Sequence, residues 1–250
     1  MKTMTKQIGL MICILATCLP ALFAGEIQTP LIVWDVNFND QELDAPPRGM
    51  SKEQIEKFNT KGDLSWAPLR TYNGLAYVTR TRHAKVVKAA LGLTDKPLLF
   101  SAADVDARSY YSPQISLNVP WELAEKAKKW RLSLDVSKAV VVDSSFWAMF
   151  VWDVANIKLH WDGMVYVENG ADVAVSSYYA GKPLHFDFLI NVPEKIVTVM
   201  IDGDPKKSVT LPWRSPKAAN FSVLKLGLLT GGCSSSIAFD NIKLIMEESK

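Results

Sequence analysis

The chain has 250 residues, with 28 basic and 26 acidic side chains, a formal net charge of +2 and 48% hydrophobic residues. Lysine and arginine are scattered among almost equal numbers of acids, so the sequence lacks the concentrated basic excess typical of nucleic-acid-binding proteins. Nucleic acid is therefore excluded as an expected partner. The apolar content is sufficient for a large hydrophobic core.

The beginning of the chain predicts a secretory signal peptide, which covers the first 24 residues. Lys2 and Lys6 form a basic leader, an uncharged and mainly apolar run follows over Ile8–Leu19, and small residues stand at Ala21 and Ala24. This run is shorter than the ~20 apolar residues that a spanning helix needs, and no later stretch approaches that length. We therefore expect an exported protein, secreted or periplasmic.

Removal of the leader changes the charge and cysteine counts. The mature chain, residues 25–250, loses Lys2 and Lys6 but no acid, and of three cysteines it keeps Cys233. No disulfide within the chain is then expected. One alternative stays open, because residues 15–18, Leu-Ala-Thr-Cys, resemble a lipoprotein processing box with a lipid anchor at Cys18. The threonine before this cysteine and the apolar residues after it favour the unanchored protein.

The mature chain reads as a single domain. It contains no linker rich in proline, serine or glycine, no block of like charge and no repeat at a fixed period. A length of about 226 residues suits one β-sandwich or barrel.

Short strands rich in β-branched and aromatic residues occupy the first half of the chain. In the segment from Trp130 to Val136 the apolar residues fall on every second position, so one face is buried and Arg131, Ser133 and Asp135 share the other. The strands are expected at Ile32–Phe38, Leu98–Ala102, Tyr110–Val119, Trp130–Val141 and Phe146–Trp152. The last of these is apolar on both faces, which favours a place in the middle of a sheet.

Hairpins dominate the second half. Ile157–Trp161 alternates, Asp162-Gly163 supplies a turn that accepts positive φ, and Met164–Glu168 returns. Leu184–Val192 alternates too, with His185 and Asp187 on its outward face. Further strands are expected at Ile196–Ile201, Ser208–Leu211, Val223–Thr230 and Ser236–Met246.

Helical patterns are scarce. They occur at Ser51–Phe58, which begins with a possible capping box, and at Trp121–Lys128. The sequence therefore predicts an all-β protein, a two-sheet antiparallel β-sandwich with one or two short helices.

Several of these segments carry a family resemblance. An opening strand that ends in Phe38-Asn39-Asp40, a hairpin with an Asp-Gly turn, the segment Val199–Gly203 and a last strand over Ile237–Leu244 resemble the concanavalin A-like (laminin G-like) jelly-roll sandwiches of secreted bacterial proteins. The resemblance implies that the first and last strands pair in one sheet, and that a glycan binds on a concave face or at the loops. It does not imply catalysis.

Catalysis is the second hypothesis. Family 16 glycoside hydrolases of this superfamily carry Glu-x-Asp-x-(x)-Glu on one strand, because retention needs two carboxyl groups ~5 Å apart. The sequence has no such triplet; its nearest acidic cluster, Asp202 and Asp204, falls in a predicted turn. The alginate-lyase-like members use Arg, His and Tyr, although their characteristic motifs, such as Gln-Ile-His, are missing here. Residues of those types are Arg131, His160, Tyr166, Tyr178, Tyr179 and His185, with Asp187 two residues beyond.

Sugar binding needs an exposed aromatic ring beside planar hydrogen-bonding groups. A sandwich of this size places most of its eight tryptophans in the core, so we expect at most one or two to be exposed. Trp161, next to the hairpin turn, is the first candidate, and Tyr178-Tyr179 is the second. The predicted ligand-binding set is Trp161, Trp147, Tyr178, Tyr179, Arg131, His185 and Asp187.

A metal prediction follows from the resemblance. Jelly rolls of this kind often hold a structural calcium ion where the first and last strands meet, which here implies Asp240 and Asp40 as ligands. The alternative is that Asp240 and Asn241 merely hydrogen-bond a neighbouring loop. Zinc is not expected, because Cys233 stands alone and the three histidines lack ligand spacing.

Three functions stay open: a lectin-like glycan-binding module, a polysaccharide-degrading enzyme, and a structural or partner-binding sandwich.

Overall fold

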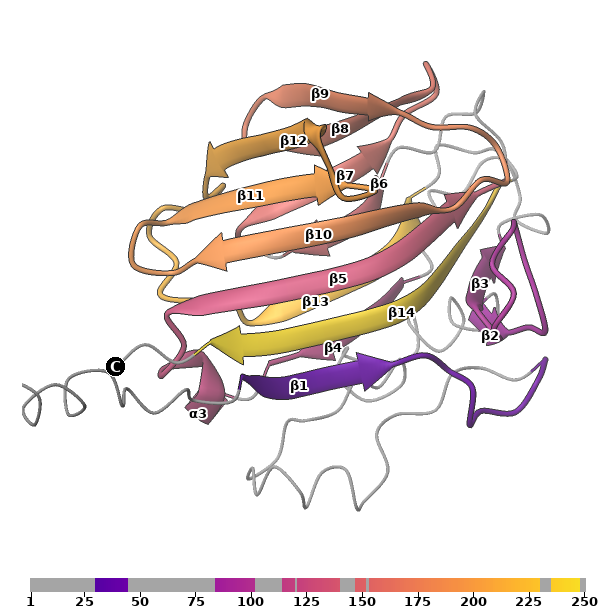
Figure 1. The fold of residues 1–250 in the computed structure, drawn as a ribbon, viewed down its shortest axis with the longest axis horizontal. Coiled ribbons are helices and arrows are strands. Elements are labelled where there is room, and N and C mark those ends of the chain that lie inside the picture. The colour runs from indigo at the N-terminus through magenta and orange to yellow at the C-terminus, as the bar shows by residue number, and fades with distance from the viewer. Residues whose placement is uncertain are drawn as a thin grey trace, which may run out of the picture.

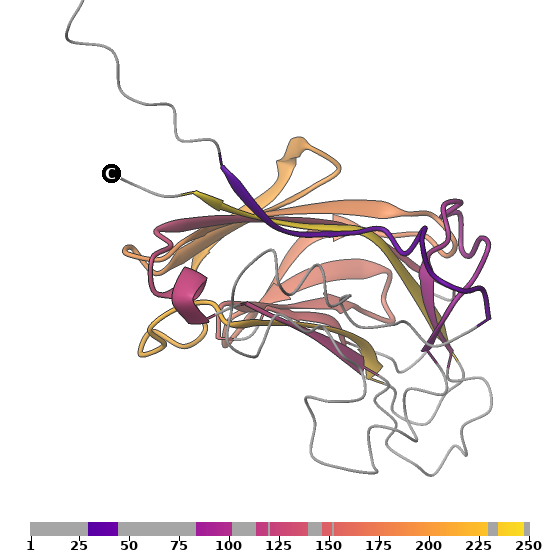
Figure 2. The same ribbon diagram turned by 90° about the horizontal axis from the view of Figure 1, so that it is seen from below.

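The protein is a sandwich of two antiparallel β-sheets (Figures 1 and 2). The computed structural model describes residues 30–44, 84–101, 114–119, 121–139, 147–151, 153–229 and 235–247. Within these ranges it has fourteen strands and one short helix, which confirms the all-β, two-sheet class. No helix in the same ranges is long and apolar enough to cross a membrane.

The larger sheet has eight strands in the order β12-β11-β10-β5-β14-β3-β2, and β1 also pairs with β14. Their bounds are β1 Leu31–Val36, β2 Ala84–Val86, β3 Leu98–Ser101, β5 Lys129–Lys138, β10 Leu184–Asn191, β11 Ile196–Ile201, β12 Asp204–Pro212 and β14 Ser236–Glu247. The antiparallel register of β1 and β14 extends from Leu31↔Met246 to Val36↔Ile242, so the expected pairing of first and last strands is confirmed.

The smaller sheet has six strands in the order β4-β13-β6-β7-β8-β9. Their bounds are β4 Gln114–Asn118, β6 Trp147–Val151, β7 Ala155–Leu159, β8 Met164–Glu168, β9 Asp172–Ser177 and β13 Val223–Leu229. β7 and β8 form the hairpin that the Asp-Gly pair predicts, and Gly163 has a φ of 83° in its turn. β6 lies between β13 and β7, the mid-sheet position expected for it.

Every second side chain along the strands points inward, and these side chains fill the space between the sheets. On β5 the side chains of Trp130, Leu132 and Leu134 are at most 1% exposed, and Phe186 and Phe188 on β10 are buried beside them. Full burial of each such side chain contributes about 1.5–3 kcal/mol. The residues that alternate with these buried ones include His185 and Asp187, which face outward as predicted.

Some elements differ from the sequence-based expectation. The helix expected over Trp121–Lys128 is one turn, α3 (Trp121–Ala124), because the chain extends into β5 from Lys129. The turn expected over Asp202–Pro205 is confined to Asp202 and Gly203, and β12 begins at Asp204. Pro205 is tolerated there since β12 is an edge strand.

Two strands of the structure, β2 and β9, were not predicted from the sequence. β9 contains small residues with little hydrophobic contrast, and β2 has three residues, so neither gives a clear pattern. The expected signal peptide, Cys18, the helix at Ser51–Phe58 and Cys233 lie outside the described residues.

A buried polar contact joins the two sheets where the chain passes from β9 to β10. Lys138, at the end of β5, is 2% exposed and donates from Nζ to the hydroxyl of Tyr178 (3.2 Å) and to the carbonyl of Leu159 on β7 (3.4 Å). Tyr178 in turn donates its hydroxyl to the carbonyl of His160 (2.7 Å), and its N–H to that of Gly163 (2.8 Å). The connection is thereby fixed against the β7–β8 turn.

We predict that Tyr178→Phe destabilises the protein by about 1–3 kcal/mol, because it removes a donor to His160 and leaves the buried ammonium of Lys138 with one acceptor fewer. Urea unfolding followed by tryptophan fluorescence measures the change. Tyr179→Phe is the matched control, since Tyr179 is 63% exposed, and its unfolding midpoint should stay at the wild-type value. Equal midpoints for all three proteins would contradict a structural role of the Tyr178 hydroxyl.

Candidate functional site

Trp161 stands exposed at the turn between β7 and β8. It is 51% exposed, whereas Trp34, Trp130 and Trp213 are at most 3% exposed. The ring of His160 lies beside it, with centroids 5.1 Å apart and an interplanar angle of 43°. The predicted exposure of Trp161 is therefore confirmed, and a neighbouring ring supports its indole.

Asp162 is held in one orientation next to Trp161. Its Oδ1 accepts the N–H of Met164 (2.9 Å), its Oδ2 accepts the hydroxyl of Tyr166 (2.7 Å), and His160 Nδ1 lies 3.1 Å from Oδ1. The hydrogen bond from Tyr166 is the main reason why the pKa of Asp162 is lowered, and the same bond raises the pKa of Tyr166. At neutral pH the turn therefore presents a fixed carboxylate beside an aromatic ring.

Polar side chains continue this surface along β7, β8 and β9. Ile157, Val165 and Val167 point into the core, so the alternate residues face outward. There Lys158 donates to Asp172 (2.7 Å) and Asn156 donates to Glu168 (2.8 Å). We call this surface the hairpin face; it consists of Lys158, Trp161, Asp162, Tyr166, Glu168 and Asp172.

Sequence reasoning found one end of the hairpin face and missed the rest. It singled out Trp161 for its place at the turn, and named Tyr166 as a neighbouring aromatic residue without including it in the predicted ligand-binding set. Lys158, Glu168 and Asp172 were not recognised. The signal was present, because the Asp-Gly turn fixes the register that sets Lys158 opposite Tyr166 and Asn156 opposite Glu168.

The two consecutive tyrosines have opposite environments. Tyr179 is exposed, and the ammonium of Lys182 lies 5.3 Å from the centre of its ring. Tyr178 is 3% exposed and its hydroxyl is used within the protein, so its prediction as a ligand platform is wrong. Trp147 lies on β6, where its backbone is opposite Lys158.

The remaining predicted residues lie on the outer face of the larger sheet. His185 Nδ1 is 2.6 Å from Asp135 Oδ1, and its Nε2 is 3.5 Å from Asp187 Oδ1. Asn241 donates to the second oxygen of Asp135 (2.7 Å). Burial by itself lowers the pKa of His185, but the hydrogen bond to Asp135 and the charges of both aspartates outweigh it, so the pKa is raised.

Arg131 belongs to the same outer face but not to this cluster. It pairs with Glu247 and lies opposite Leu189 rather than His185. The predicted ligand-binding residues therefore do not form one site. Trp161 follows β7 of the smaller sheet, whereas Arg131, His185 and Asp187 lie on β5 and β10 of the larger sheet. The two sheets are separate layers of the sandwich (Figure 2).

Asp240 is a buried carboxyl group at an irregularity in the pairing of β14 with β5. It is 1% exposed and its Oδ1 accepts the N–H of Asn241 (2.8 Å). Burial, with smaller contributions from the charges of Asp135 and Asp95, raises the pKa of Asp240 to about 6.

Asp40, the other predicted calcium ligand, is exposed in the segment after β1. The carbonyls of its neighbours Asn39 and Gln41 accept hydrogen bonds from the ammonium of Lys96 (2.8 and 3.2 Å). Over the described ranges, no three His, Cys, Asp or Glu side chains converge as a metal cluster. Any calcium ion held by Asp240 would thus need backbone carbonyls or water as further ligands.

Comparisons with known proteins give fold neighbours at low similarity. No family model matches the sequence, and no curated protein matches it. Similar solved structures include a sialidase (16% identity, TM-score 0.48, 65% of this chain and 17% of that one) and the botulinum neurotoxin serotype C1 binding domain (8%, 0.47, 67% and 43%). An alginate lyase from Corynebacterium sp. is a third (11%, 0.45, 59% and 76%). The chain spans less than half of the first two, and at these values the similarities carry no functional information.

We predict that Asp240 makes stability fall as the pH rises. The unfolded carboxyl group loses its proton near pH 3.8 but the folded one keeps it to about pH 6, so stability is full at the acid end and is lost across this interval. The loss is on the order of 2–3 kcal/mol. Asp240→Asn should abolish it. Urea unfolding of both proteins in chelator, from pH 4 to 7, measures the difference, and a constant difference across that range would contradict the prediction.

Proposed function

We propose that this protein is an exported carbohydrate-binding module that holds a polysaccharide on the hairpin face. The observation that carries the proposal is the 51% exposure of Trp161 in a protein that buries Trp34, Trp130 and Trp213. An exposed indole ring offers a flat apolar surface for stacking, and the apolar face of a sugar ring is a suitable partner for it.

The neighbours of Trp161 supply the polar half of sugar recognition. A pyranose stacked on the indole has hydroxyl groups around its edge, and a fixed carboxylate accepts hydrogen bonds from them. Asp162 is already oriented by Met164 and Tyr166, so little conformational entropy is lost on binding. Glu168 and Asp172 extend the row of acceptors along the hairpin, which favours a polymer over a monosaccharide.

The proposed export agrees with this assignment, because cell-wall and extracellular-matrix polysaccharides lie outside the cell membrane. The basic leader, apolar run and small residues of the first 24 positions are the basis for proposing a secreted or periplasmic location. A lipid anchor at Cys18 is the alternative form of the same exported protein.

A second candidate function, degradation of a polysaccharide, rests on His185. Its Nδ1 contacts Asp135, an arrangement that fixes a ring orientation and stabilises a proton on the imidazole. Incubation with polysaccharides and detection of new reducing ends or unsaturated uronates tests this reaction. Release of neither product by the wild type would exclude it for those substrates.

We predict that Trp161→Ala weakens polysaccharide binding by about tenfold or more, because it removes the stacking surface. Pull-down with insoluble polysaccharides, among them cellulose, chitin and pectin, identifies the ligand, and depletion isotherms then give the affinity. Trp161→Phe keeps an aromatic ring and should bind within several-fold of wild type.

Leu189→Ala is the matched control for this experiment. Leu189 is 41% exposed on the larger sheet, so its removal deletes a similar apolar surface on the other side of the sandwich and should leave binding unchanged. A folded Trp161→Ala protein that binds as well as wild type would exclude the hairpin face as the site.

We propose in addition one structural calcium ion beside Asp240, as the family resemblance implies. A buried carboxyl group with Asp135 and Asp95 nearby is a region of negative potential, which favours a divalent cation. Asp40 is the proposed second carboxylate ligand.

If the ion binds only the folded protein, calcium raises the melting temperature by mass action. Asp240→Ala should remove most of this gain and leave glycan binding nearly intact. Asp40→Ala, a change at an exposed position, is the second variant should the first fail to fold. Calorimetric scans with calcium and with chelator measure the effect, and identical curves for the wild type would mean that no such site exists.

A further inference from the structure

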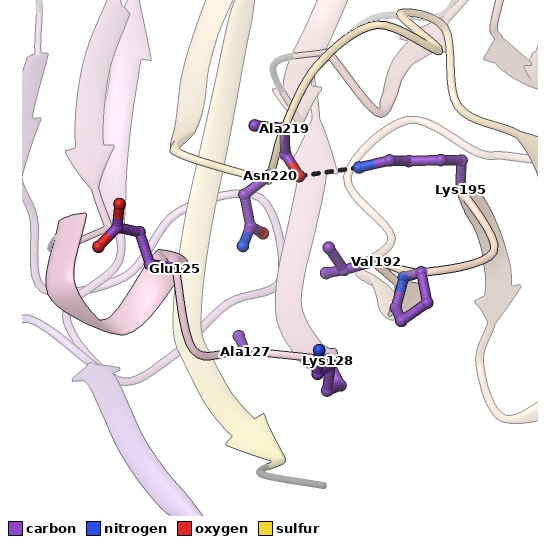
Figure 3. A pocket seen from close by; sticks show the side chains of 8 residues that line it. Glu125, Ala127, Lys128, Val192, Lys195, Ala219 and Asn220 are labelled. Atoms are coloured by element: carbon purple, nitrogen blue, oxygen red, sulfur yellow. Dashed lines mark hydrogen bonds between the residues drawn. The ribbon is translucent and has the colours of Figure 1, made fainter.

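A pocket lies at the end of the sandwich remote from Trp161. It is an open pocket with a volume of about 500 Å³, lined by the α3–β5 connection, the turn between β10 and β11, and the loop before β13 (Figure 3). β5 begins beside this pocket and ends at Lys138, which contacts the connection next to the hairpin turn. Ten residues of strand therefore separate the two regions, roughly 30 Å at ~3.3 Å per residue.

Lys195 holds a positive charge at one wall of the pocket. Its Nζ donates to the carbonyl of Ala219 (2.8 Å, the dashed line in Figure 3) and lies 4.2 Å from the centre of the Trp213 ring. Trp213 is fixed in turn, because its backbone N–H donates to the backbone carbonyl of Lys195 (2.7 Å). An ammonium has three N–H donors, so the bond to Ala219 leaves capacity for a ligand. Burial lowers the pKa of Lys195, which reflects partial loss of water around the charge.

Asn220 presents a donor from a second wall. Its Oδ1 accepts the indole N–H of Trp130 (3.3 Å) and the backbone N–H of Phe221 (2.7 Å). Because these two bonds determine which end of the amide is the oxygen, the NH₂ group takes the other position. Figure 3 shows this side chain extending into the space between Glu125 and Val192.

The rest of the lining is partly charged and partly apolar. Lys128 adds a second ammonium and Glu125 a single carboxylate, while Ala127, Val192 and Pro193 provide apolar surface. Two cations and an amide donor against one anion favour a negatively charged ligand, and the apolar residues suit one side of a saturated ring. The volume lies in the range of ~300–1,000 Å³ that small-molecule sites occupy.

We propose that this pocket binds a small hydroxylated carboxylic acid of about one ring, such as a sugar acid, with the carboxylate between Lys195, Lys128 and the amide of Asn220. This binding site is separate from the hairpin face and goes beyond the proposed function. The ligand is recognised by its charge, so a neutral sugar of the same size is a poor substitute.

Calorimetric titration of the mature chain with glucuronate tests the proposal, with glucose and inorganic phosphate as comparison ligands. Glucuronate should bind, and glucose at the same concentration should give no signal. Asn220→Asp is the key variant, because the new carboxylate keeps the acceptor for Trp130 and Phe221 but replaces the donor in the pocket with a negative charge. We expect it to bind glucuronate at least about tenfold more weakly.

Lys128→Ala should weaken binding several-fold, and Lys217→Ala is its matched control because Lys217 is exposed and does not line the pocket. Melting curves establish that each variant is folded. The proposal is overturned if the folded wild type does not bind glucuronate, if Asn220→Asp binds like wild type, or if glucose binds as tightly. Phosphate binding as tight as that of glucuronate would overturn the sugar-acid assignment.

The same titration separates this site from the hairpin face. Trp161→Ala should bind glucuronate like wild type even if it loses polysaccharide binding, and Asn220→Asp should show the reverse. Loss of glucuronate binding in a folded Trp161→Ala protein would place the ligand on the hairpin face and overturn the pocket proposal.

Discussion

The buried ammonium of Lys138 constrains the rest of this structure. A charge removed from water costs several kcal/mol unless hydrogen-bond acceptors surround it, so the groups that face Lys138 must be placed accurately. Two of these acceptors come from different parts of the fold, the carbonyl of Leu159 in the smaller sheet and the hydroxyl of Tyr178 in the connection between sheets. Because Tyr178 also bonds His160 and Gly163, the position of the hairpin turn depends on an interaction made in the core. The hydrogen bonds of Tyr178 thereby hold in place the turn that carries the exposed indole of Trp161.

The local pattern of the sequence was sufficient for most of the fold. Alternation in β5 and β10 predicted which residues are buried, and the Asp-Gly pair predicted the β7–β8 turn, because both signals depend on neighbours a few residues away. Tyr178 and Tyr179 show where such reasoning stops. They are adjacent and identical, and the connection that holds them has no periodicity. Which of them turns inward is decided by Lys138, forty residues earlier in the chain.

The candidate sites were harder to predict for a related reason. Alternation indicates that His185, Asp187 and Lys158 face outward, but not on which of the two sheets each one lies. That assignment requires the order of strands, in which β10 joins β5 and β14 while β7 and β8 join β6 and β9. The end pocket is less accessible still to sequence reasoning. Glu125, Lys195 and Asn220 belong to three segments without strand character, which only the closed sandwich brings together.

The two proposed sites differ in how they handle charge. On the hairpin face each acid has a donor of its own, with Asp162 bonded to Tyr166, Glu168 to Asn156 and Asp172 to Lys158. Tyr166 and Asn156 are neutral donors, so only Lys158 offsets a negative charge and the face stays net negative. Stacking on Trp161 and directional hydrogen bonds to these carboxylates therefore suit a neutral sugar chain rather than an acidic one. In the pocket the ammonium groups of Lys128 and Lys195 exceed the single carboxylate of Glu125, and Lys195 is partly shielded from water. Electrostatic attraction is stronger where water is partly excluded, so there charge selects the ligand.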